Sequence, residues 1–148
     1  MKEKKQRSNW YVASVHYATA GIFWPWIIGI LISFGFMAMG MEVVVNLAFE
    51  QYPLIAALIS TAIFAGVTYV AVIASARFIQ KRYIVEDMDA VLKISLIYFV
   101  GVTAFFISTS FWFPDPEYPM TAINWVATVI DSLVLFGVFY WASKKYLR

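Results

Sequence analysis

The hydrophobic positions of this chain form four long, almost uninterrupted apolar runs, which short polar segments separate. A helix needs about 20 apolar residues to cross roughly 30 Å of hydrocarbon, and each run is long enough to supply them. The runs also lack the alternation of period two that is typical of a membrane β-barrel. The sequence therefore predicts an all-α membrane protein, a bundle of four transmembrane helices.

The first apolar run is too long for a single crossing. It covers residues 10–48, and at about 1.5 Å per residue one helix of this length would overshoot the bilayer. Gly21 and Pro25 predict a break, because proline favours the start of a helix over its interior. We expect a short interfacial helix over 9–22 and a span over 24–47, with a single longer, tilted first span as the alternative.

The remaining three runs each predict one further span. They cover about 53–78, 91–113 and 120–141, and charges or prolines bound each of them. The connections between the spans are short, so little of the chain remains for a soluble domain. We expect a single integral membrane domain over residues 1–148.

Basic residues are confined to three segments of the chain. They are Lys2, Lys4, Lys5 and Arg7 near the N-terminus, Arg77, Lys81, Arg82 and Lys93 in and around the loop over 79–90, and Lys144, Lys145 and Arg148 at the C-terminus. The other two connections carry only acidic charges. By the positive-inside rule, both termini and the 79–90 loop should face the cytoplasm of a bacterial or archaeal plasma membrane.

Composition narrows the chemistry that the chain can perform. With 62% hydrophobic and 14% charged residues, it is unlike a soluble domain. The absence of cysteine excludes disulfides, thiolate nucleophiles and cysteine-ligated metal centres. A net charge of +2 without a basic patch argues against nucleic acid as a partner. The single histidine, His16, cannot supply a histidine-rich metal site, and we predict neither metal nor cofactor.

Small and polar residues recur at helical spacing within the spans, which predicts the faces where the helices pack. Helix association in a bilayer depends on the close approach of small residues and on hydrogen bonds between side chains. The predicted packing residues are Thr61, Ala65, Thr68 and Ser75 on the second span, and Gly101 and Ser108 on the third.

Two acidic residues lie within predicted spans. Asp131 is near the middle of the fourth, where a charge costs about 2.5–3.5 kcal/mol. Because hydrocarbon disfavours a charged carboxylate, the protonated acid would donate a hydrogen bond to Asn124, Thr128 or a neighbouring helix. Glu42, with Asn46 one turn later, lies near the outer end of the first span. We predict helix–helix contacts for these five residues, with proton or cation binding as the alternative.

Motifs of soluble enzymes do not occur in the chain, which has no phosphate-binding glycine loop, nucleophile elbow or HExxH. We expect a non-enzymatic membrane protein that assembles in the bilayer, as a homo-oligomer or as a subunit of a larger complex. One alternative is a small proton- or cation-linked channel or transporter that uses Asp131 and Glu42, and another is a membrane immunity or protective inhibitor protein. The 79–90 loop is either a plain connection or a docking site for a cytoplasmic partner.

Overall fold

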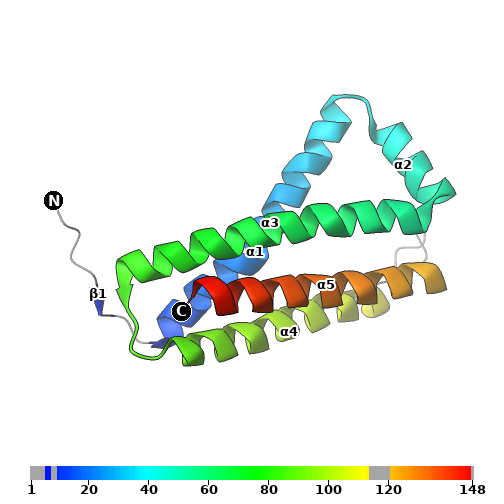
Figure 1. The fold of residues 1–148 in the computed structure, drawn as a ribbon. Helices are drawn as coiled ribbons and strands as arrows, with labels where there is room; N and C mark the ends of the chain where they lie inside the picture. The colour runs from blue at the N-terminus through cyan, green and yellow to red at the C-terminus, as the bar shows by residue number, and fades with distance from the viewer. Residues whose placement is uncertain (1–5, 8–9, 114–120, 148) are drawn as a thin grey trace.

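The computed structural model describes residues 6–7, 10–113 and 121–147, and helices dominate it (Figure 1). The helices are α1 (Trp10–Ala38), α2 (Glu42–Gln51), α3 (Pro53–Arg82), α4 (Met88–Trp112) and α5 (Ala122–Tyr146). Four of them, α1, α3, α4 and α5, are long and apolar enough to cross a membrane. The predicted all-α, four-helix membrane bundle is confirmed.

The first apolar run is organised differently from the prediction. α1 continues as one helix through Gly21 and Pro25, so the break between an interfacial helix over 9–22 and a span over 24–47 is not there. Pro25 cannot donate to the carbonyl of Gly21 one turn earlier, but membrane helices tolerate proline where neighbouring helices support the backbone. Both residues are buried. The longer first span, named above as the alternative, matches the structure.

α1 ends instead at a glycine turn. Gly40 has a φ of +68°, in the left-handed region that favours glycine. The N–H of Met41 donates to the carbonyl of Phe36 at 2.9 Å, and the N–H of Gly40 donates to the carbonyl of Met37 at 3.0 Å. These two bonds form a Schellman motif, which terminates the helix and satisfies its last carbonyls.

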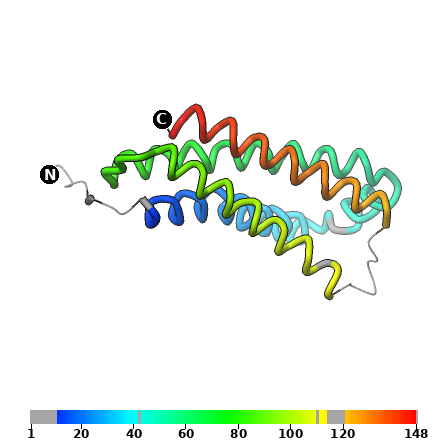
Figure 2. Tube along the Cα trace, turned by 90° about the horizontal axis from the view of Figure 1, so that it is seen from below, coloured from blue at the N-terminus to red at the C-terminus, as the bar shows by residue number. Residues whose placement is uncertain are grey.

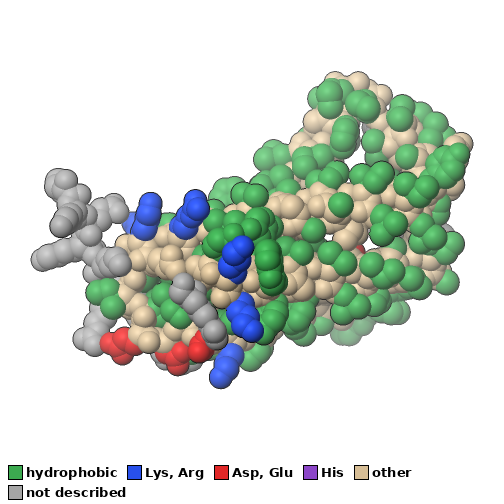
Figure 3. Space-filling view, viewed as in Figure 1, with side chains coloured by type: hydrophobic (Ala, Val, Ile, Leu, Met, Phe, Trp, Pro, Cys, Tyr) green, Lys and Arg blue, Asp and Glu red, His purple; other side chains and the backbone are tan. Residues whose placement is uncertain are grey.

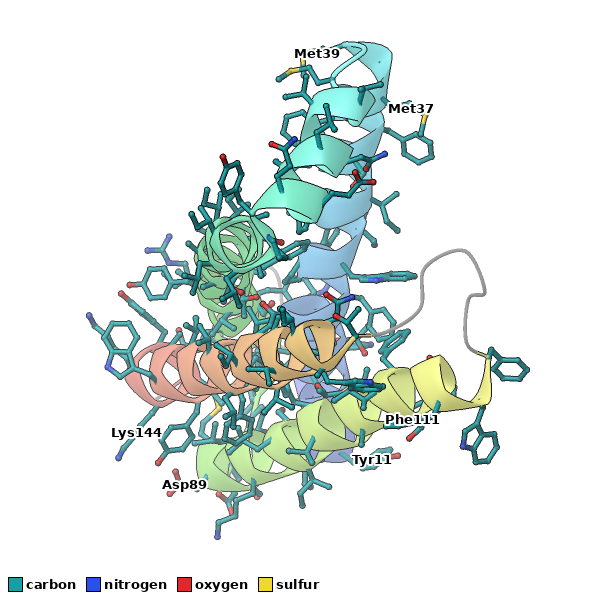
Figure 4. The ribbon with its side chains drawn as sticks, turned by 90° about the vertical axis from the view of Figure 1, so that its right-hand side faces the viewer. Tyr11, Met37, Met39, Asp89, Phe111 and Lys144 are labelled. Atoms are coloured by element: carbon teal, nitrogen blue, oxygen red, sulfur yellow. The ribbon has the colours of Figure 1, made fainter. Side chains whose placement is uncertain are left out.

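α2 is a short helix that returns the chain from this turn to the start of α3. At ten residues it extends only about 15 Å, half the thickness of the hydrocarbon layer. Figure 4 shows Met37 and Met39 at the tip where α1 and α2 meet, well away from Asp89 and Lys144. Pro53 then begins α3, a position that suits proline.

The long helices enclose a core over only part of their length. α3 packs against α1 and α5, and α1 also packs against α4. The buried cluster comprises Ala13, Tyr17, Val72, Ala76, Ile79, Val91, Leu92, Phe99, Phe139, Ala142 and Leu147. We call residues 10–25, 65–99 and 135–147, which contain this cluster, the closed half. It lies at the end where α1 begins and α5 ends (Figure 2).

The rest of the bundle, which we call the open half, comprises residues 26–64, 100–112 and 122–134. Here α1 diverges from α4 and α5 and meets α2 at the tip (Figure 1). Two aromatic contacts still cross this half: Phe111 stacks on Trp125 with ring centroids 4.3 Å apart, and Trp26 lies 5.9 Å from Phe106. Most other large side chains of the open half are exposed.

Charged side chains gather at the far end of the closed half. In Figure 3 the Lys and Arg side chains, and acidic side chains near them, occupy the left-hand half, while the remaining visible surface is mainly apolar. The cations whose side chains the structure describes are Arg77, Lys81, Arg82, Lys93, Lys144 and Lys145. One end of the bundle is therefore basic, as the order of charges along the sequence predicts.

The loop predicted over 79–90 is shorter in the structure, because α3 continues to Arg82 and α4 begins at Met88. Within it, β2 (Tyr83–Ile84) pairs in parallel with β1 (Gln6–Arg7), which holds this part of the N-terminal segment beside the loop. Asp87 caps α4 by accepting a hydrogen bond from the N–H of Ala90 at 2.9 Å, and Asp89 lies in the first helical turn. Acidic groups at these positions stabilise the start of a helix.

Candidate functional site

The polar residues of α5 form a continuous face in the open half. Asn124, Thr128 and Asp131 follow one another at spacings of four and three, so they share one side of the helix. Asn124 is exposed, and Thr128 and Asp131 are half-buried. Because this face carries an acid within a helix apolar enough to span a membrane, we take this polar face of α5 as the candidate functional site.

Hydrogen bonds along this face stay within α5. The hydroxyl of Thr128 donates to the carbonyl of Asn124 at 2.9 Å, and that of Ser132 donates to the carbonyl of Thr128 at 2.8 Å. No hydrogen bond or ion pair joins Asp131 to another of the described residues. The predicted bond from Asp131 to Thr128 or Asn124 is therefore not seen, and the acid remains available to a group from outside the chain.

The second predicted acid lies on a different element. Glu42 is the first residue of α2, and its side chain is outside the described part of the structure. Asn46 and Glu50, one and two turns later on the same helical face, are exposed. α2 packs chiefly against α3, whereas Asp131 belongs to α5. The two predicted acids therefore belong to different helices.

The polar face of α3 lies inside the bundle. Thr61, Thr68 and Ser75 are buried and Ala65 is half-buried. The hydroxyl of Ser75 donates to the carbonyl of Ala71 at 2.6 Å, which satisfies it within the helix. These small side chains lie on a helix that packs against both α1 and α5.

The corresponding face of α4 is placed differently. Gly101 and Ser108 are exposed, and a Cβ added at Gly101 would meet nothing within 4 Å. Ser108 donates to the carbonyl of Ala104, also exposed, at 2.7 Å. These residues do not pack against another of the described helices, because α4 turns a different side toward α1.

A packing face at the start of α1 was not predicted from the sequence. Ser14, Ala18 and Gly21 are buried along the segment that we had expected to lie in the interface. Beside them, the hydroxyl of Tyr17 donates to Oγ of Ser143 at 2.7 Å, joining α1 to α5. The signal was present, since these three small residues are spaced by four and three, as on α3.

A lateral groove between α1 and α3 was also not predicted. Its volume is about 1190 Å³, and its walls are almost entirely apolar. His16 lies at its end nearest the charged residues, where Nδ1 of the ring is 2.8 Å from the hydroxyl of Tyr83. The one histidine of the chain is thus hydrogen-bonded to the 79–90 loop.

The described side chains do not suggest a metal centre. Within residues 6–7, 10–113 and 121–147, no three His, Cys, Asp or Glu residues lie close enough together to hold an ion. Comparison of the chain with protein-family models, with curated proteins and with solved structures found no match. Function must therefore be inferred from the fold and from the placement of its polar side chains.

Proposed function

We propose that this polytopic membrane protein is non-enzymatic and acts by assembling within the bilayer, with copies of itself or with other membrane subunits. The polar face of α5 in the open half of the bundle provides the contact surface. The closed half, which contains the packed core, holds the four long helices together. In this proposal a partner packs against the polar face of α5, which the chain itself covers only in part.

The partly exposed polar face of α5 is the observation that supports this proposal. Asn124 and Asp131 lie on a helix long and apolar enough to span a membrane, and the described chain leaves Asn124 exposed and Asp131 half-buried. A charged residue at the bilayer centre costs about 2.5–3.5 kcal/mol on an insertion scale. A neighbouring helix that offers hydrogen-bonding groups removes part of this cost. Lipid tails cannot do so, and the face therefore favours a protein partner.

Replacing Asp131 should weaken the assembly. Hydrogen bonds between membrane helices contribute about 0.6 to 1.7 kcal/mol, so Asp131→Leu should reduce the association constant about 3- to 20-fold. Leucine can face lipid at no cost, which also favours the separated chain. Blue-native electrophoresis of the mildly solubilised protein over a dilution series measures the change. Asp131→Asn retains a side chain that can form hydrogen bonds, so it should assemble like the wild type. If Asp131→Leu and the wild type dissociated equally, the proposal would be contradicted.

The same asparagine variant separates assembly from the alternative of a proton or cation pathway. A half-buried acid without a partner among the described residues also suits ion binding. In that case wild-type protein in liposomes should carry a flux that Asp131→Asn abolishes. The assembly proposal expects no flux from either protein, so a flux that depends on Asp131 would replace it.

We further propose that the chain lies in a bacterial or archaeal plasma membrane with both ends in the cytoplasm. The described cations gather at the end of the bundle where α1 begins and α5 ends (Figures 2 and 3), and cytoplasmic segments carry an excess of Lys and Arg. Reporter domains fused to either end should therefore both be active in the cytoplasm. Reporters that place the ends in opposite compartments would overturn this topology.

A further inference from the structure

The groove between α1 and α3 has the form of a slot for a long apolar chain. Its α1 wall extends from His16 to Ile28, a distance of about 18 Å along the helix. The hydrocarbon of one membrane leaflet is about 15 Å thick, half of the full layer. Of the few polar groups in the walls, the hydroxyl of Ser75 is already bonded to the carbonyl of Ala71. The interior therefore suits an acyl chain rather than a polar ligand.

The charged end of the groove carries groups that suit a phosphate. Phe78 lines the groove here, and the guanidinium of Arg82 lies 5.6 Å from the centroid of its ring. Arg82 is exposed, and as the residue one turn after Phe78 it continues the lining face of α3. The hydrogen-bonded pair of His16 and Tyr83 lies beside it, since the Tyr83 and Phe78 rings are 6.3 Å apart. Arginine forms strong, often bidentate hydrogen bonds with phosphate.

We propose that this groove binds an anionic phospholipid, with one acyl chain between α1 and α3 and the headgroup phosphate on Arg82. The inference is independent of the proposed assembly, which uses the polar face of α5. The two surfaces belong to different helices, because the groove is formed by α1 and α3.

Charge favours a lipid over a second copy of the chain as the occupant. Copies in one membrane share one orientation, so a second copy would bring its own basic end to the level of Arg82. The cations with described side chains at this end outnumber the acids, which are Glu86, Asp87 and Asp89; the cations are Arg77, Lys81, Arg82, Lys93, Lys144 and Lys145. Like charges repel at this short range, whereas an anionic headgroup complements the excess.

Native mass spectrometry after exchange with equal amounts of phosphatidylglycerol and phosphatidylcholine tests the headgroup contact. We expect the wild type to retain one phosphatidylglycerol in preference to phosphatidylcholine, and Arg82→Gln to reduce this preference about fivefold. Arg77→Gln is the matched control on the same helix, since the charge of Arg77 lies near Tyr146 of α5, which does not line the groove. Equal retention of the two lipids by the wild type, or equal losses in the two variants, would overturn the proposal.

A second pair of variants tests the acyl-chain slot. Gly66 lines the groove, and a Cβ added there meets nothing within 4 Å, so Gly66→Leu should fill the slot without displacing protein atoms. Gly137→Leu is the control, because Gly137 on α5 has equally open surroundings and does not line the groove. Gly66→Leu should lose the retained lipid, and Gly137→Leu should keep it. Retention by Gly66→Leu, or a cross-link from the groove to a second copy, would contradict the proposal.

Discussion

Replacing Phe139 with alanine should lower the free energy of unfolding by about 3 kcal/mol, the lower end of the range for such core truncations. Phe139 is fully buried, and its ring centroid lies 5.1 Å from that of Phe99 and 5.8 Å from that of Tyr17. Alanine would leave a cavity where α1, α4 and α5 meet. The lower end of the range applies because the unfolded chain in a membrane is already surrounded by lipid. The loss of stability then comes from lost van der Waals contacts and not from exposing the side chain to water.

Circular dichroism during thermal or dodecyl sulfate unfolding in lipid-containing micelles measures this loss. Phe105→Ala is the control, since Phe105 is 64% exposed and packs little within the chain. It removes the same atoms and should change stability by less than about 1 kcal/mol. If the two variants were equally stable, the core of the closed half would not lie where we describe it.

Gly21→Ala should destabilise the bundle by about 1–3 kcal/mol, the usual cost of overpacking a core. A Cβ at Gly21 would lie 2.6 Å from Cε2 of Phe139. The ring cannot easily move away, because Tyr17 and Phe99 pack against it. Helix propensity acts in the opposite direction, since alanine favours a helix over glycine by up to about 1 kcal/mol. A net loss of stability would therefore show that steric overlap outweighs propensity.

Gly35→Ala on the same helix isolates the propensity term. A Cβ there meets nothing within 4 Å, so this variant should be neutral or more stable. The double variant Gly21→Ala, Phe139→Leu should lose less stability than the two single changes added together, because the smaller side chain makes room for the new methyl group. Strictly additive losses would mean that Gly21 and Phe139 are not in contact.

The spans were predictable because their signals are local. Uninterrupted apolar length and the separation of basic from acidic connections identify crossings without any knowledge of packing. The predicted ends of the spans were less accurate than their positions. For example, α3 continues to Arg82 and does not end near residue 78. A helix can extend beyond the hydrocarbon layer until a particular residue ends its backbone hydrogen bonding. The pattern of apolar residues does not identify that residue, so it does not predict the end of the helix.

The boundary of the first span was mispredicted for a physical reason. The rule that proline ends a helix comes largely from soluble proteins. In the interior of a membrane bundle, neighbouring helices support the backbone, and a proline such as Pro25 can lie within a helix. The actual stop, Gly40, carried a recognisable signal, because glycine just beyond an apolar helix is the usual residue of a Schellman turn. Gly21 does not break the helix; it allows α1 to approach the ring of Phe139 closely.

The residue types of the candidate site could be predicted from the sequence, but the direction in which its helix face points could not. An acid in the middle of a span identifies Asp131 from sequence alone. Which side of a helix meets a neighbour depends on how all the helices are rotated and crossed, and that is a property of the whole bundle. For this reason Thr68 is buried while Gly101 and Ser108, chosen by the same rule, are exposed. The groove beside α1 likewise depends on how α1 and α3 lie against each other.

The mass of the wild-type particle, extracted with its native lipids into nanodiscs, tests the central claim most directly. Mass photometry or native mass spectrometry can distinguish one chain of 16.9 kDa from an assembly. We expect each particle to contain at least two copies, or one copy with another membrane protein, covering the α5 face that carries Asp131. A population of single chains, with lipid alone around that face, would contradict the account.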